Sequence, residues 1–175
     1  SDGRNIKVML LHSCKAKAYL HICHGMAEHM DRYKDFAEAM AKQGFNVICH
    51  NHRGHGDNEI LGHYADDSGW LKTINDIKDV QDNLIKDSTL PLFLMGHSMG
   101  SFIAQGFAIR YGDRLAGLIL SGTNYQHPFM YHAGRIVAKI ENLRLGLGTP
   151  SKTMDTLSFA SFNICCITDS SKGFQ

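Results

Sequence analysis

The sequence has few prolines, a single tryptophan, no long apolar run and no excess of charge of either sign. Its 18 lysines and arginines nearly balance its 17 aspartates and glutamates, which leaves a formal net charge of +1. Such a balance gives no electrostatic reason to bind nucleic acid. No apolar run approaches the roughly 20 residues that span a bilayer, and the first residues lack the pattern of a signal peptide. We therefore expect no nucleic-acid partner and no membrane-spanning segment.

Cysteine is present, but not in a pattern that forms a disulfide framework or a thiolate zinc site. The five cysteines are odd in number and two of them are adjacent. Cys23 and Cys49 lie in apolar runs, where a thiol packs as a small hydrophobe. This usage favours a reducing compartment, so we expect a cytoplasmic protein. With 43% hydrophobic residues among 175, the chain can bury the core of one domain.

Short apolar runs alternate with segments of helical periodicity. Four runs are typical of buried strands: 18–25, 45–50, 90–95 and 115–122. The segments between them have apolar residues at helical spacing: 33–44, 74–84 and 98–111. This alternation predicts βαβ units, and hence an α/β fold with a mostly parallel sheet and helices on both faces.

Two local signals indicate where these helices end and begin. Gly44 is suited to a left-handed cap after the first helix. Thr73 and Asp76 have the spacing of a capping box, which predicts that the second helix starts beside Thr73. The polar, glycine-rich segment 52–69 that precedes it is expected to be a loop.

A serine lies between two glycines where a predicted strand meets a predicted helix. Gly96-His97-Ser98-Met99-Gly100 fits the G-x-S-x-G pattern of a nucleophile elbow, in the context that the pattern requires. The turn is so sharp that the residues two before and two after the serine must lack side chains. It holds a hydroxyl at a helix N-terminus, where free N–H groups favour negative charge. Ser98 is therefore the candidate nucleophile, and a plain turn with an N-capping serine is the alternative.

An acyl-transfer site also needs two backbone N–H donors for the oxyanion. One is the N–H of the residue after the nucleophile, Met99. The other should come from a loop that follows an earlier strand, and His24-Gly25-Met26 begins such a loop. We expect the N–H groups of Met26 and Met99 to converge near the Ser98 hydroxyl.

Three segments, HGMAEHMDRY, NHRGHG and FLMGHSMGSF, occur in an order and spacing that resemble a known family. The resemblance is to the monoglyceride lipase and lysophospholipase branch of the α/β-hydrolase superfamily, of the serine aminopeptidase S33 type. It covers the chain from its start to about residue 163. It implies an α/β-hydrolase fold and a serine esterase of lipid metabolism that acts on a small lipid-like ester, either a monoacylglycerol or a lysophospholipid, with no cofactor.

The resemblance also implies roles for single residues. Ser98 would be the nucleophile, and Met26 and Met99 would give the oxyanion N–H groups. Supporting positions would be His24, Gly25, Gly96, His97 and Gly100, while Glu28 and Arg32 would hold the loop after the first strand. The family usually has aspartate where this chain has Asn51. Because asparagine keeps some of the hydrogen bonds, we expect a structural effect and no lost catalytic group.

The histidines allow a different class of enzyme. His50, His52 and His55 have the H-x-H-x-x-H spacing of some zinc hydrolases. That zinc motif carries aspartate where this chain has Gly54, and the resembling family explains these histidines without a metal. We therefore predict no metal site, with a zinc hydrolase as the less favoured alternative. Most of the eleven histidines are expected to be ordinary loop and strand-end residues.

The strand–helix alternation stops near residue 127. Apolar residues then recur at helical spacing: Ile136, Val137, Ile140, Leu143 and Leu147. By resemblance, 1–126 is the N-terminal part of the hydrolase core, 127–163 begins a helical cap, and 164–175 is an atypical tail. An apolar cap suits a lipid-like ester and peripheral contact with a membrane. The alternative is an ordinary surface helix that packs on the sheet.

A serine hydroxyl is a poor nucleophile without a base. In this superfamily the acid and then the histidine follow the serine. The only histidines after Ser98 are His127 and His132. The only acids after it are Asp113, Glu141, Asp155 and Asp169. No triad acid or histidine is identified among them, because none follows a strand of the required type.

The resemblance therefore implies truncation before the strands that carry the triad acid and histidine, with a sheet that is incomplete at its C-terminal side. An open sheet edge favours self-association or pairing with a partner chain. A catalytically inactive fragment or pseudoenzyme of the same fold is the alternative function.

Overall fold

A computed structural model describes residues 2–56, 60–85, 87–124, 128–146, 149, 151–154 and 156. The chain divides into two compact units, 1–124 and 125–175. The second unit contains the helix α4 (Pro128–Leu145). The predicted tail at 164–175 lies outside the described residues. No described helix combines the length and the apolar character needed to cross a membrane.

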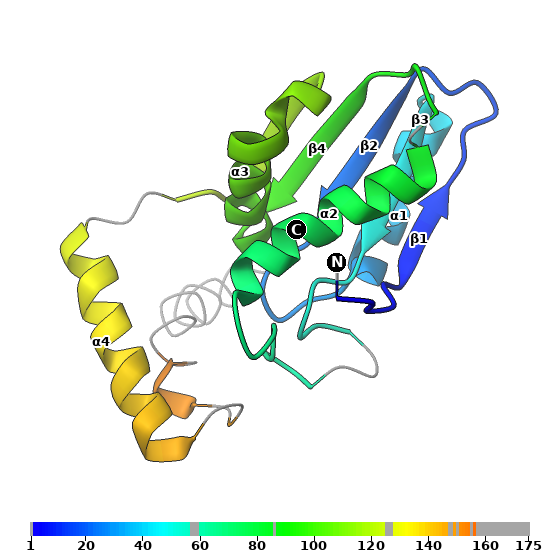
Figure 1. The fold of residues 1–175 in the computed structure, drawn as a ribbon. Coiled ribbons are helices and arrows are strands. Elements are labelled where there is room, and N and C mark those ends of the chain that lie inside the picture. The colour runs from blue at the N-terminus through cyan, green and yellow to red at the C-terminus, as the bar shows by residue number, and fades with distance from the viewer. Residues whose placement is uncertain are drawn as a thin grey trace, which may run out of the picture. The chain divides into compact units, whose positions relative to one another are not determined.

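The first unit is built on a five-stranded sheet (Figure 1). Its strands are β1 (Val8–Leu11), β2 (Ala18–Cys23), β3 (Phe45–His50), β4 (Leu92–His97) and β5 (Gly117–Ser121), in the spatial order β1-β3-β2-β4-β5. All neighbouring pairs are parallel except β1 and β3. The four predicted strands and the mostly parallel sheet are thus confirmed. The short antiparallel strand β1 was not predicted, since four apolar residues at a sheet edge carry no periodic signal.

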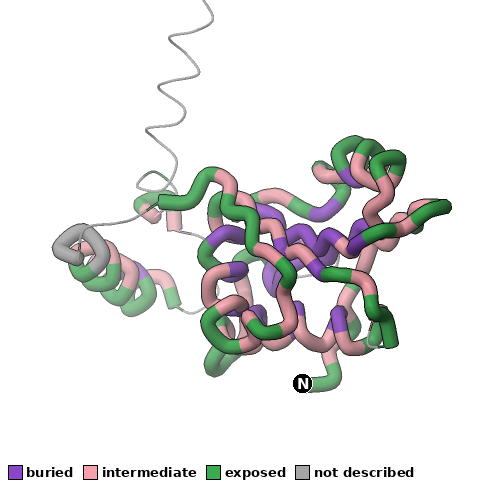
Figure 2. The backbone as a smooth tube through the Cα atoms, turned by 90° about the horizontal axis from the view of Figure 1, so that it is seen from above, coloured by how far each residue is buried: buried purple, intermediate pink, exposed green. Residues whose placement is uncertain are grey.

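Helices cover both faces of this sheet, as predicted. They are α1 (Lys34–Lys42), α2 (Gly69–Ile85) and α3 (Met99–Tyr111), with the short 3-10 turns η1 (Met30–Tyr33) and η2 (Gly112–Arg114). In Figure 1, α2 and α3 lie in front of the sheet and α1 lies behind it. Figure 2 shows the buried backbone gathered in the interior of this unit. The sheet is therefore a rigid support for the loops at the carboxyl ends of its parallel strands.

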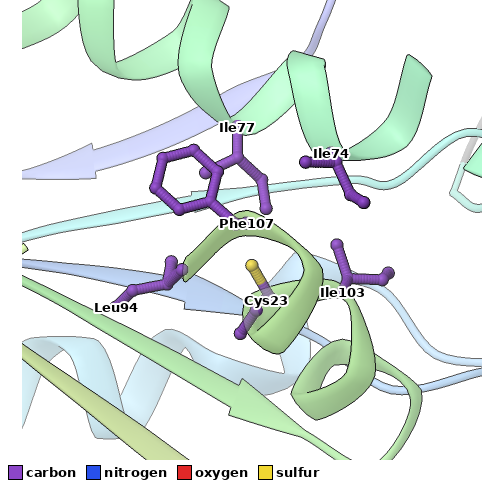
Figure 3. Close-up of a cluster of buried hydrophobic side chains, with 7 residues drawn as sticks. Cys23, Ile74, Ile77, Leu94, Ile103 and Phe107 are labelled. Carbon is purple, nitrogen blue, oxygen red and sulfur yellow. The ribbon is translucent and has the colours of Figure 1, made fainter. Parts of the chain in front are cut away.

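Alternation along the strands divides the core into two clusters. On the face of α2 and α3, Cys23 and Leu94 contact Ile74, Ile103 and Phe107 (Figure 3). On the α1 face, the buried members are Leu20, Ile22, Met30, Ala37, Val47 and Cys49. The cysteines of both clusters are free and buried, as expected for thiols that pack as hydrophobes. Burial, the largest cause, raises the pKa of Cys49 to about 12.

The structure corrects one predicted helix start and confirms one predicted helix end. Gly44 follows α1 with φ +92°, the left-handed conformation expected of a glycine cap. The capping box is wrong, because α2 begins at Gly69 and Thr73 lies inside the helix. There the Thr73 hydroxyl donates to the carbonyl of Gly69 at 2.9 Å. The carboxylate of Asp76 is engaged by an arginine from another segment.

That arginine, Arg53, joins the loop after β3 to α2 and to the N-terminal segment. Its Nε and Nη2 each donate to Asp76 at 2.7 Å, and its Nη1 donates to Asp2 at 2.6 Å. Arg4 also reaches Asp76, at 3.3 Å. The side chains of Arg53 and Asp76 are only 4% and 1% exposed, so each charge depends on the other for compensation.

Asp76→Ala is expected to lower the free energy of unfolding by about 3–5 kcal/mol, the usual cost of breaking a buried ion pair from one side. Arg53 would then stay buried with half of its acceptors gone. Urea denaturation followed by circular dichroism measures this change. Asp67→Ala is the matched control, because the ion pair of Asp67 with Lys72 is exposed and contributes little. Equal effects of the two variants would contradict the buried network.

Strand β5 forms one edge of the sheet in the described part of the chain, where it pairs only with β4. Its apolar residues Leu118, Ile119 and Leu120 are between 37% and 45% exposed. Alternate residues of a strand face opposite sides of a sheet, so apolar surface is exposed on both sides of this edge. Parallel sheets normally cover such surface.

Candidate active site

Ser98 occupies the strand-to-helix turn that the sequence predicts. It lies between β4 and α3 with φ 51° and ψ −119°, a backbone conformation that residues with side chains rarely adopt. Its N–H donates to the carbonyl of Ser121 at 2.9 Å, and its own carbonyl accepts from the Ser101 N–H and hydroxyl at 2.9 and 2.6 Å. These bonds hold the strained turn in place. The side chain of Ser98 is exposed, and its hydroxyl makes no hydrogen bond to a described residue.

The two glycines of the pattern are required by close packing. A Cβ on Gly96 would lie 2.3 Å from the carbonyl oxygen of Gly100. A Cβ on Gly100 would lie 2.1 Å from the carbonyl oxygen of Cys23 and 2.5 Å from that of His24. These atoms belong to the backbone, so no side-chain rotation can relieve the contacts. The contacts at Gly100 show that helix α3 starts directly against the end of β2.

The loop after β2 lies beside the serine. A Cβ on Gly25 would be 3.3 Å from the Cβ of Ser98 and 2.7 Å from Oε1 of Glu28. The Glu28 carboxylate accepts hydrogen bonds from the Gly25 N–H and the Tyr33 hydroxyl, and it pairs with Arg32 at 3.1 Å. Burial would raise the pKa of Glu28, but these three donors lower it below its usual value. Glu28 therefore stays ionised and ties the loop to the turn at η1.

The two predicted oxyanion donors occupy positions at the Ser98 end of their elements. Met99 is the first residue of α3, where backbone N–H groups have no partner within the helix. Met26 follows Gly25 and is half-exposed, and within the described residues its N–H makes no backbone hydrogen bond. Both N–H groups are thus available to an acceptor. That they converge on one oxygen stays a prediction.

The other predicted supporting residues lie around the same turn. His97 is directed toward β5, where its Nδ1 lies 3.2 Å from the Ser121 hydroxyl. His24 is buried beneath the loop, with Nδ1 2.7 Å from the carbonyl of Gly25. Asn51 accepts a hydrogen bond from the Met30 N–H at 2.8 Å. Asparagine thus serves as a structural acceptor at this position.

Tyr64 is a neighbour of the site that sequence reasoning missed. It lies in the loop between β3 and α2, and its hydroxyl donates to the sulfur of Met99 at 2.8 Å. Its ring contacts that of His55, and its Cβ lies 2.7 Å from where a Cβ on Gly69 would be. No periodicity or motif marks this tyrosine, because its partner is 35 residues away.

The zinc alternative has no support in the structure. Among the described residues, which include His50, His52 and His55, no group of three potential ligands is arranged to hold a metal ion. The Nδ1 of His50 is instead 2.9 Å from Nε2 of His21. The Nδ1 of His55 is 2.9 Å from the carbonyl of Arg53. The H-x-H-x-x-H spacing therefore serves packing and hydrogen bonding here.

No base for Ser98 is identified among the residues that the structure describes. His127 lies outside the described residues, and His132 lies on α4 in the second unit. Of the four acids after Ser98, Asp113 belongs to η2 and Glu141 to α4, while the other two lie outside the described residues.

Comparison with known proteins decides the family. A family profile described as "Serine aminopeptidase, S33", a hydrolase family, matches residues 14–160. The chain belongs to this hydrolase family. It is a monoglyceride lipase-like α/β-hydrolase by family.

Individual relatives agree with this membership. The chain is 40% identical over 144 residues to a monoglyceride lipase homolog of Monkeypox virus, which covers 81% of this chain and 49% of the viral protein. It is 35% identical over 105 residues to monoglyceride lipase of Homo sapiens, which covers 59% of this chain and 34% of the human protein. A solved structure titled "Lipase (Open form)" matches with a TM-score of 0.76 and 28% identity, over 90% of this chain and 53% of that one. The chain thus spans half or less of the length of these curated relatives.

Proposed function

We propose that this α/β-hydrolase cleaves carboxylic esters of the monoacylglycerol or lysophospholipid type through an acyl-enzyme on Ser98. The observation that carries the proposal is the strained turn at Ser98 with Gly25 packed against it, in a family whose curated relatives include monoglyceride lipases. The coarser statement, an ester hydrolase of lipase type, rests on the hydrolase family together with its monoglyceride lipase relatives.

In the proposed reaction, the Ser98 oxygen attacks the acyl carbonyl carbon while a general base takes the hydroxyl proton. The N–H groups of Met26 and Met99 donate to the oxyanion that forms. Collapse of this intermediate expels the alcohol, which receives a proton, and leaves the acyl group on Ser98. Water then attacks the acyl-enzyme, releases the fatty acid and restores the serine.

The ionised Glu28 supports this reaction from a distance. It accepts the Gly25 N–H and so fixes the backbone immediately before Met26. A donor held in advance of the reaction stabilises the oxyanion without reorganisation. Glu28 is thus a positioning residue in the proposal.

The second unit is proposed to be the start of a helical cap. Ile136, Ile140 and Leu143 of α4 recur at helical spacing and are exposed. Such a stripe is suited to a single acyl chain and to peripheral contact with a membrane. The cysteine usage supports a cytoplasmic location, and the exposed edge at β5 supports self-association or a partner chain. An inactive fragment of the fold is the second candidate, favoured by the absence from the sequence of an identified triad acid and histidine.

The test of the proposal is where an acylating probe attaches. With the protein in the longest form encoded, a fluorophosphonate is expected to modify Ser98, as shown by mass spectrometry of peptides from the labelled protein. Ser98→Ala should abolish this labelling, whereas Ser88→Ala, at a loop away from the elbow, should leave it unchanged. Labelling that survives Ser98→Ala would refute the assignment of the nucleophile.

Substrate class is tested separately by comparing monoacylglycerol, lysophospholipid and amino-acid anilide substrates with the protein in the longest form encoded. We expect faster cleavage of the single-chain esters than of the anilide. Faster anilide cleavage would favour a peptidase, as the name of the family profile suggests.

A further inference from the structure

Five histidines from separate segments meet in the interior beneath the candidate site. They are His21 and His24 at β2, His50 at β3, and His52 and His55 in the loop that follows, and all are 7% exposed or less. The ring centroids of His24 and His52 are 4.3 Å apart, those of His50 and His52 4.9 Å, and those of His21 and His50 5.0 Å. The sequence analysis expected most histidines to be ordinary loop and strand-end residues; four of these five do lie in loops or at strand ends, but it did not foresee their burial.

The hydrogen bonds of the cluster require neutral rings. His24 donates from Nδ1 to the Gly25 carbonyl and accepts the His52 N–H on Nε2 at 3.0 Å, so it carries a single proton. With the Gln81 amide as donor to His21 Nδ1 at 3.3 Å, His21 must donate from Nε2 to His50. A second proton on His24 or His21 would break one of these bonds, because each ring already uses one nitrogen as an acceptor.

Three ring nitrogens of the cluster are buried without a described partner. They are Nε2 of His50 and both nitrogens of His52. A charge on the buried His52 ring would therefore have no hydrogen-bond acceptor among the described side chains. Uptake of a proton in the folded state is most costly at this ring.

Few charged groups face the cluster, and together they do not stabilise a protonated histidine within it. From the N-terminal segment, Arg4 opposes protonation of His50. From the loop after β2, Glu28 favours protonation of His24, while His29 opposes it. From α2, the facing residue Gln81 is neutral, and Asp76 is already paired with Arg53.

We propose that this histidine cluster makes the fold an acid-sensitive switch: the cluster ties the loop after β2 to the loop after β3 at neutral pH, and proton uptake on unfolding opens the fold in mild acid. The inference does not depend on the function proposed for Ser98, since it concerns the stability of the folded chain.

The direction of the pH dependence follows from linkage. Burial, the largest cause in each case, lowers the pKa of His21 to about 3 and of His24 to about 4, and it lowers those of His50 and His52 well below the ordinary value. The unfolded chain binds these protons near the ordinary histidine pKa of about 6.5 and the folded chain does not. The contribution of these neutral histidines to the stability of the fold is therefore fully present above this pKa. It is lost as pH falls below it, before most carboxylates titrate.

The test is urea denaturation of the whole chain at several values between about pH 7.5 and pH 5. The four histidines with lowered pKa values bind protons only in the unfolded chain. For each unit that pH falls, they should therefore raise the unfolding equilibrium constant by up to about 10⁴-fold. His52→Leu removes one such group without removing a side-chain hydrogen bond. The rise of the unfolding equilibrium constant for each unit that pH falls should therefore be about tenfold smaller in this variant. His12→Gln, an exposed histidine, is the matched control and should not change the slope. A flat profile, or one that His52→Leu leaves unchanged, would overturn the switch.

A second measurement decides the matter if His52→Leu does not fold. Ring C–H signals of histidines in the native wild-type chain report protonation directly by NMR. The signals of His21, His24, His50 and His52 should stay at their neutral positions down to about pH 5. Titration of all histidine signals together in the folded state would refute the proposal.

Discussion

Gly100→Ala is expected to prevent the first unit from reaching its folded state, with a loss above about 4 kcal/mol in the free energy of unfolding. The new Cβ would lie 2.1 Å from the Cys23 carbonyl oxygen and 2.5 Å from that of His24. Both carbonyls belong to the backbone at the end of β2, a central strand that is hydrogen-bonded on both sides. Relief would require α3 to move away from the sheet, which would open the core cluster around Ile103 and Phe107.

Gly112→Ala is the matched control for this substitution. Gly112 ends α3 with φ −66° and ψ −25°, a conformation that alanine adopts without strain, and a Cβ there meets nothing within 4 Å. Its expected effect is neutral to slightly stabilising. Urea denaturation and near-ultraviolet circular dichroism compare the two variants. A Gly100→Ala protein as stable as the Gly112→Ala protein would mean that α3 does not abut the end of β2.

The second large effect concerns turnover. A polypeptide limited to these 175 residues is expected to hydrolyse p-nitrophenyl esters on the order of 10⁶ more slowly than an intact serine hydrolase of this kind. Triad members act as a unit, so without the base only the oxyanion donors and substrate binding contribute. Turnover would fall far below the usual enzyme range of roughly 1–10³ per second.

The measurement compares the parent chain with Ser98→Ala under the same conditions. A small difference between the two is expected. Ordinary turnover that Ser98→Ala abolishes would show that a base is present within these residues. His127→Gln and His132→Gln would then identify it, because they are the only histidines after Ser98. Size-exclusion chromatography of the same samples tests whether the exposed edge at β5 leads to association.

The four parallel strands and the sharp turn at Ser98 could be predicted from the sequence because their causes are local. Apolar runs such as 18–23 and 45–50 require burial on both faces, which identifies strands of a parallel sheet. Gly96, Ser98 and Gly100 specify a sharp turn through sterics within five residues, so the pattern and its geometry coincide. The order of these segments was also sufficient to identify the family.

Other features depended on contacts between distant residues, which no local pattern encodes. Thr73 and Asp76 have capping-box spacing, but Arg53 recruits the carboxylate, and α2 begins at Gly69 instead. Tyr64 reaches Met99 only because the loop after β3 folds over the end of β4.

Burial of histidine was the largest difference between sequence and structure. Imidazole is polar enough for a loop and apolar enough for a core, so the residue type alone does not decide its place. Two neighbouring parallel strands and the loops that follow them carry His21, His24, His50 and His52. Their rings come together only when the sheet forms. The sequence by itself determined the four parallel strands, the sharp turn at Ser98 and the family, because these follow from local sterics, apolar periodicity and the order of the motifs. Tertiary packing alone decided which histidines are buried away from solvent and therefore stay neutral.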